Sequence, residues 1–190
     1  MKKDGSLTLV HICLIVFALI LSVVSIVLLF VATDGYDRGE RMQYTIFYVI
    51  NALALISVFV YALKGYGKDV KFFYNAFFCM QIVASIWLFI LDITFFKSGA
   101  ASIIALIVLA IKALALIAIT FLADLKNKAW ILFYIILGAD VIGVILSLIS
   151  VSSADVAFKV VASITQLVVA GVLGLAIYKK HSDKLKRGRI

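Results

Sequence analysis

Six long apolar segments, separated by short polar ones, make up nearly the whole chain. Each is long enough to cross the ~30 Å hydrocarbon core of a bilayer, which takes about 20 apolar residues in a helix. A membrane β-barrel would show strands of about ten residues that alternate polar and apolar positions, and these segments are continuously apolar over about twice that length. The sequence therefore predicts an all-α membrane protein, a six-helix bundle with spans at about Leu7–Ala32, Thr45–Leu63, Phe72–Phe96, Ala100–Ala123, Ala129–Val151 and Val156–Tyr178.

The connections between these spans are too short to hold a second domain. Polar and turn-forming residues mark the reversals, as in residues 34–41 and 65–69. Residues 1–178 are therefore expected to form one six-helix transmembrane domain, followed by a basic tail at 179–190. The first span is much longer than the 7–15 apolar residues of a signal peptide, and no small-x-small cleavage pattern precedes Thr33, so we expect this span to be retained.

Composition agrees with a membrane location, because 65% of the 190 residues are hydrophobic. The net charge of +8 comes mainly from basic residues that flank the spans, which favours a topological explanation over nucleic-acid binding. We therefore expect a multi-pass protein of a cell membrane with both termini in the cytoplasm. The end of the bundle predicted to face away from the cytoplasm carries only Arg38, Arg41, Lys97 and, just inside the sixth span, Lys159. The basic tail at 179–190 is expected to contact anionic lipid headgroups.

Four strongly polar residues are predicted at one depth inside the bilayer. Counted from the cytoplasmic ends of their spans, Lys112, Asp140, Gln81 and Gln166 all lie about 9 to 12 residues deep, which places them near the bilayer midplane. Charged residues at this depth cost several kcal/mol unless they find partners. Lys112 and Asp140 lie in consecutive antiparallel spans and are therefore expected to pair.

Helical spacing places other small or polar residues on the same faces as these four, and such faces are expected to turn inward. The faces are His11, Ala18, Ser22 and Ser25 in the first span; Gln81, Ser85 and Asp92 in the third; Asp140, Gly143, Ser147 and Ser150 in the fifth; and Lys159, Ser163, Gln166, Ala170 and Gly174 in the sixth. Ordinary packing between membrane helices also uses small and polar residues, so the pattern alone leaves both interpretations open.

Two interpretations of the midplane group remain. Lys112 and Asp140 can form a structural ion pair that fixes helix register. Alternatively, the four residues form a polar site, in which Asp140 exchanges Lys112 for a proton or cation, Lys112 holds an anionic group, and Gln81 and Gln166 orient the ligand. Asp92, nearer the other end of its span, would then serve the entrance.

The remaining polar and aromatic residues are assigned structural roles. Asn51 is expected to form a hydrogen bond between helices, and Tyr44 and Tyr48 are expected to be anchors at the membrane interface. No hydrolase, nucleotide-binding or metalloprotease motif is present, so we expect neither catalysis nor a cofactor or metal. The sequence predicts a small membrane protein that binds or transports a small solute or ion; the alternative is a non-transporting accessory subunit with a structural Lys112–Asp140 pair.

Overall fold

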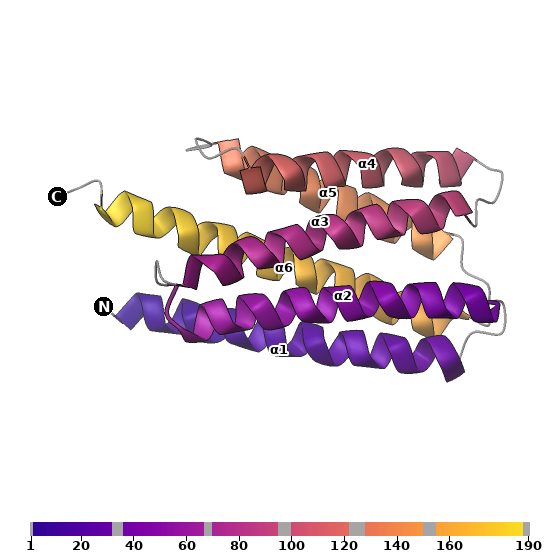
Figure 1. Cartoon of the computed structure of the whole chain (residues 1–190), viewed down its shortest axis with the longest axis horizontal. Coiled ribbons are helices and arrows are strands. Elements are labelled where there is room, and N and C mark those ends of the chain that lie inside the picture. The colour runs from indigo at the N-terminus through magenta and orange to yellow at the C-terminus, as the bar shows by residue number, and fades with distance from the viewer. Residues whose placement is uncertain are drawn as a thin grey trace.

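The computed structural model of the chain describes residues 2–31, 36–66, 70–94, 100–121, 128–149 and 155–187. Within these ranges there are no strands, and each of the six helices contains a stretch long and apolar enough to cross a membrane. The predicted all-α six-helix bundle is confirmed (Figure 1). The helices are α1 (Lys2–Val31), α2 (Arg38–Leu63), α3 (Lys71–Thr94), α4 (Ala100–Phe121), α5 (Lys128–Ile149) and α6 (Val156–Arg187).

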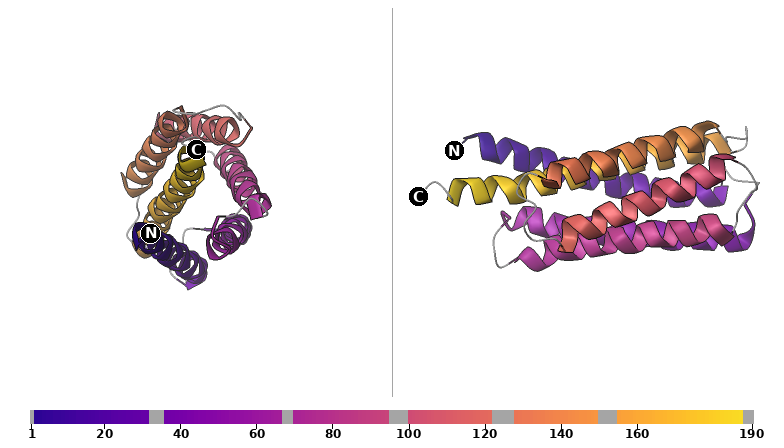
Figure 2. Two further views of the ribbon diagram at one scale, coloured as in Figure 1. Left: turned by 90° about the vertical axis from the view of Figure 1, so that its left-hand side faces the viewer. Right: turned by 90° about the horizontal axis from the view of Figure 1, so that it is seen from above.

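Successive helices run in opposite directions along one axis (Figure 1). α1 therefore begins and α6 ends at the same end of the bundle, which we call the terminal end. We call the opposite end, at which α2, α4 and α6 begin, the distal end. Each helix packs against its neighbours in the chain, and α6 packs back against α1, so the helix contacts form a closed ring (Figure 2).

The helices extend beyond the predicted spans where polar residues continue the helical structure. The reversal predicted at residues 34–41 is shorter than expected, because α2 already begins at Arg38. Asp37 accepts a hydrogen bond from the backbone N–H of Glu40 (2.7 Å), and the Glu40 carboxylate accepts one from the backbone N–H of Asp37 (3.2 Å). This reciprocal capping box satisfies two N–H groups at the helix start and extends α2 beyond its apolar segment. The predicted span ends at residues 32, 95–96, 122–123 and 150–151 lie outside the described residues.

The basic segment predicted from residue 179 begins as a continuation of α6. α6 continues to Arg187, and Lys179 is buried, donating a hydrogen bond from Nζ to Thr8 Oγ1 (3.2 Å). Lys180 Nζ lies 4.1 Å from the centroid of the Tyr74 ring. The long alkyl stems of lysine allow such packing while the ammonium finds a polar or aromatic partner. These two lysines therefore belong to the bundle, and lipid-headgroup contact by the rest of the segment stays a prediction.

An apolar core fills the terminal half of the bundle. Leu55, Phe77, Phe78, Leu116 and Val172, from four different helices, are among its fully buried side chains. Large side chains of this kind fill the space between helices to the density of a protein interior. The terminal half is therefore closed by side-chain packing.

A buried histidine ties three segments together in this half. His11 Nε2 lies 3.2 Å from the carbonyl oxygen of Val172, so this nitrogen donates a hydrogen bond. His11 Nδ1 then accepts from the hydroxyl of Tyr66 at 2.8 Å. Tyr66 follows α2 with a positive φ of 60°, which is uncommon for a residue with a side chain. The inward orientation predicted for the His11 face of the first span is confirmed, since His11, Ala18, Ser22 and Ser25 are all buried.

Close packing between α5 and α6 requires a glycine at position 174. A methyl group on Gly174 would lie 2.7 Å from the Phe133 ring, whereas the same group on Gly171 would meet nothing within 4 Å. Overpacking of this kind typically costs about 1–3 kcal/mol.

Gly174→Ala is expected to lower the free energy of unfolding by about 1 kcal/mol or more because Phe133 must move. Gly171→Ala, on the same helix, is the matched control and is expected to leave stability unchanged or slightly improved. Denaturant titration of both variants in detergent makes the comparison. Equal stabilities for the two variants would contradict the packing described here.

Candidate functional site

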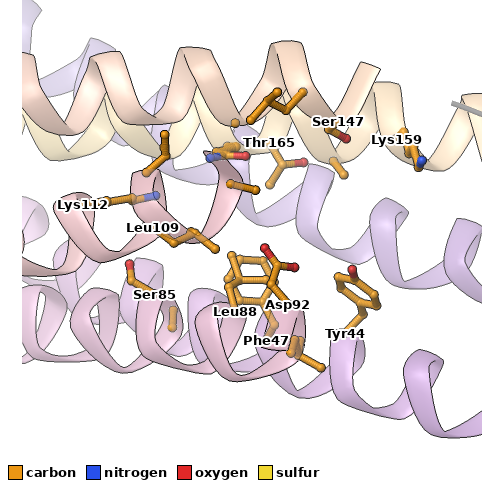
Figure 3. Close-up of a pocket in the computed structure, with 18 of the residues that line it drawn as sticks. Tyr44, Phe47, Ser85, Leu88, Asp92, Leu109, Lys112, Ser147, Lys159 and Thr165 are labelled. Atoms are coloured by element: carbon orange, nitrogen blue, oxygen red, sulfur yellow. The ribbon is translucent and has the colours of Figure 1, made fainter. Parts of the chain in front are cut away.

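A cavity of about 470 Å³ lies in the distal half of the bundle, between α2, α3, α4, α5 and α6 (Figure 3). Its volume falls within the range of small-molecule sites in proteins. None of the described residues of α1 lines it. The polar residues of its wall are Tyr36, Glu40, Tyr44, Tyr48, Asn51, Gln81, Ser85, Asp92, Ser102, Lys112, Ser147, Lys159, Thr165 and Gln166.

The cavity extends from the distal ends of the helices to mid-depth in the bundle. Lys112 lies 12 residues from the start of α4, or about 18 Å along the helix. Val169 lines the cavity and also belongs to the apolar core, so the floor of the cavity is the top of that core. At the distal end, the half-exposed side chains of Glu40 and Lys159 contribute to the wall.

Asp140 connects three helices at the floor of the cavity. Its Oδ1 accepts hydrogen bonds from Lys112 Nζ of α4 at 2.5 Å and from Gln166 Nε2 of α6 at 2.7 Å. The side chain of Asp140 is 3% exposed and that of Lys112 is 12% exposed. The structure thus joins the oppositely charged residues that the sequence predicted to pair. Lys112 and Gln166 line the cavity, whereas Asp140 lies behind them.

Gln81 lies at the cavity wall but does not join this cluster. Its Nε2 donates to Asn51 Oδ1 of α2 (3.1 Å), and Asn51 Nδ2 donates to the carbonyl oxygen of Phe47 (3.1 Å). The expected role of Asn51 in bonding between helices is confirmed. Two polar clusters, one on α4, α5 and α6 and one on α2 and α3, therefore line the same cavity.

Asp92 lies two residues from the distal end of α3, at the cavity wall, and is half-buried. It makes no hydrogen bond or ion pair with any residue that the structure describes. Figure 3 shows its carboxylate pointing into the cavity, as the Tyr44 side chain does. The predicted position of Asp92 near the entrance therefore agrees with its place in the fold, and its role in binding stays a prediction.

Two tyrosines predicted at the membrane interface line the cavity. The prediction for Tyr44 and Tyr48 was wrong: both line the cavity, Tyr48 is 4% exposed, and each packs edge to face against Phe158 of α6. The spacing of Tyr44, Tyr48 and Asn51, at i, i+4 and i+7, places all three on one helix face and was the available signal. This spacing could not be distinguished from that of tyrosines at a membrane interface without knowing how far α2 extends.

Tyr36, just before α2, packs edge to face on the rings of Tyr44 and Phe158. Burial raises the pKa of its hydroxyl to about 12, and the carboxylates of Asp155, Glu40 and Asp92 contribute to the increase. The phenol therefore stays neutral at physiological pH.

The wall of the cavity carries amide, hydroxyl, ammonium and carboxylate groups. Amide, hydroxyl and ammonium groups can orient a polar ligand. No group of three His, Cys, Asp or Glu side chains suited to a metal ion occurs among the described residues. No family model, no curated protein and no solved structure matches the chain.

A double-mutant cycle tests the pair at the cavity floor. Lys112→Met and Asp140→Leu are each expected to destabilise the protein by about 3–5 kcal/mol, because each leaves an unpaired charge in the bundle. The double variant is expected to recover much of that loss. Recovery should be more complete when Gln166→Leu is added, because Gln166 also loses its acceptor. Additive losses in denaturant titrations would show that the two charges do not interact.

Proposed function

We propose that this protein binds a small polar solute or ion in the distal cavity and carries it into or across the membrane. The observation that supports this function best is the cavity itself. Polar residues in lipid normally find partners within the protein, and ordinary helix packing would bring them together without leaving space. Here polar groups from five helices surround an open volume of about 470 Å³.

The polar groups that line the cavity favour a solute as its ligand. Lys112 has three N–H groups, and Asp140 is its single acceptor among the described residues. Gln166 and Gln81 each donate one amide N–H to a neighbouring side chain and retain further capacity to donate and accept. A polar ligand would meet these groups at the floor, with Asp140 holding Lys112 and Gln166 in place.

The asymmetry of the bundle is consistent with access from the distal end. The cavity reaches the distal ends of the helices, whereas the apolar core fills the terminal half. Movement of a solute to the terminal end would require this core and the hydrogen bonds of His11 to rearrange. If both termini are cytoplasmic, as the sequence predicts, the distal end faces away from the cytoplasm.

The alternative function is that of an accessory subunit without a ligand. The two functions predict different molecules bound to the purified protein. Native mass spectrometry after gentle release from the membrane reports bound small molecules, lipids and partner chains together. The proposed function predicts a defined polar small molecule on the protein. A complex with another protein, carrying lipid alone, would favour the accessory role.

Two glycines of α5 supply a matched pair of variants for this experiment. Gly143 lines the cavity, where an added side chain would point toward the Gln166 amide, 3.5 Å from the first added carbon. Gly138 is exposed on the same helix and has no neighbouring atom within 4 Å of an added carbon.

Gly143→Leu is expected to reduce the ligand-bound fraction at least about tenfold by filling the cavity, and Gly138→Leu is expected to leave it unchanged. Thermal unfolding of both variants checks that they fold equally well. Retention of the same molecule by Gly143→Leu would place the ligand elsewhere and contradict the proposed site.

A further inference from the structure

The distal half of the cavity differs from its floor in the charges along the wall. Asp92 and Glu40 contribute carboxylates, and Lys159 contributes the one ammonium among the described lining residues of this half. Glu40 accepts the backbone N–H of Asp37 in the capping box. Asp92, in contrast, has no hydrogen-bonding or ion-pairing partner among the residues the structure describes. The charge at the floor is already balanced, because Lys112 pairs with Asp140.

Aromatic rings line the same half. The centroids of Tyr36, Tyr44 and Tyr48 each lie 5.9–6.3 Å from that of Phe158. Aromatic rings attract cations to their faces, and the attraction is stronger where water is excluded. Asp92 and Tyr44 extend from neighbouring helices into the same space (Figure 3).

The carboxylates and aromatic rings of the distal half together favour one class of ligand over others. An anion would meet two carboxylates, against the single ammonium of Lys159, before it reached the floor. A metal cation such as Ca²⁺ takes six to eight oxygen ligands, and the described residues do not gather three side chains suited to a metal. A cation with an apolar surface would instead satisfy the Asp92 charge and the rings at once.

We propose that the distal half of the cavity binds a small organic cation, an amine or quaternary ammonium compound, between the Asp92 carboxylate and the rings of Tyr44, Tyr48 and Phe158. This inference rests on the proposed function and assigns its ligand class.

Three probes of nearly the same shape test the charge preference directly. Choline, 3,3-dimethylbutan-1-ol and 3,3-dimethylbutanoate share a branched skeleton and are positive, neutral and negative. Isothermal titration of the purified full-length protein in detergent is expected to give the tightest binding for choline, by at least about tenfold over the alcohol. Equal binding of the alcohol, tighter binding of the carboxylate, or binding of none of the three would overturn the inference.

Variants assign the preference to Asp92. Asp92→Asn keeps the shape and removes the charge, and is expected to weaken choline binding about tenfold while leaving the alcohol unaffected. Asp37→Asn is the matched control, because it removes a carboxylate at the same end of the bundle, outside the cavity wall, and asparagine is an equally good N-cap. Equal losses in the two variants would show that Asp92 has no specific role.

Native mass spectrometry separates failure of this inference from failure of the proposed function. A bound molecule that is neutral or anionic, and that Gly143→Leu removes, would leave the proposed function standing and contradict the ligand class. A protein that carries no small molecule and binds none of the probes would contradict both.

Discussion

A carboxylate at mid-depth in a membrane bundle has no bulk water to face, and this constraint decides how α4, α5 and α6 meet. Asp140 satisfies it by accepting hydrogen bonds from Lys112 of α4 and Gln166 of α6 through one oxygen. Sliding either helix by one turn, about 5.4 Å, would separate these groups and leave a charge unpaired. This one carboxylate therefore links three helices at the cavity floor.

The two halves of the bundle differ in how their interior is filled, with an apolar core in the terminal half and a cavity in the distal half. Phe77, Phe78 and Leu116 fill the terminal half. In the distal half the same helices, with α5 and α6, present small residues to the interior: Ala84, Ala101, Ala105, Ala139, Gly143 and Ala162. Small residues on membrane helices often allow backbones to approach closely. Here the polar groups and rings between them keep the helices apart, so the small residues line a space.

Much of this architecture could be predicted from the sequence. The length of an apolar segment and the depth of a polar residue within it can both be counted along a single helix. The spans and the pairing of Lys112 with Asp140 follow from counting residues at 1.5 Å per position, and the inward polar faces follow from the period of 3.6 residues per turn. The partner of Gln81 could not be predicted, because several polar residues share its depth and only the helix order around the ring selects Asn51. The burial of Tyr44 and Tyr48 could not be predicted either, since a tyrosine near a helix end suits both an interface and a cavity wall.

The ends of the helices were the least predictable part of the fold. The apolar segment of the sequence ends at a given residue, but the helix can continue beyond it. The capping box at Asp37 and the packing of Lys179 on Thr8 and Tyr66 both extend helical structure into charged sequence. The capping box is a local pattern, an N-cap residue followed three positions later by Glu, and was an available signal in the sequence. The Lys179 contacts become visible only once α1 and Tyr66 are placed beside α6.

The cavity reaches the distal ends of the helices and the apolar core closes the terminal half, so a water-borne reagent should enter the cavity from one side only. Single cysteines at Ser147 and Ala162 of the cavity wall, and at Ala54 and Ala176 of the apolar core, test it in a background in which Cys13 and Cys79 are replaced by alanine. The variants are treated in sealed membrane vesicles with a hydrophilic thiol reagent that does not cross the bilayer. Both cavity cysteines are expected to react from one side of the membrane alone, and both core cysteines are expected to stay unreactive. Cavity cysteines that stay unreactive would contradict this arrangement. Core cysteines that react as fast as the cavity cysteines would contradict it as well.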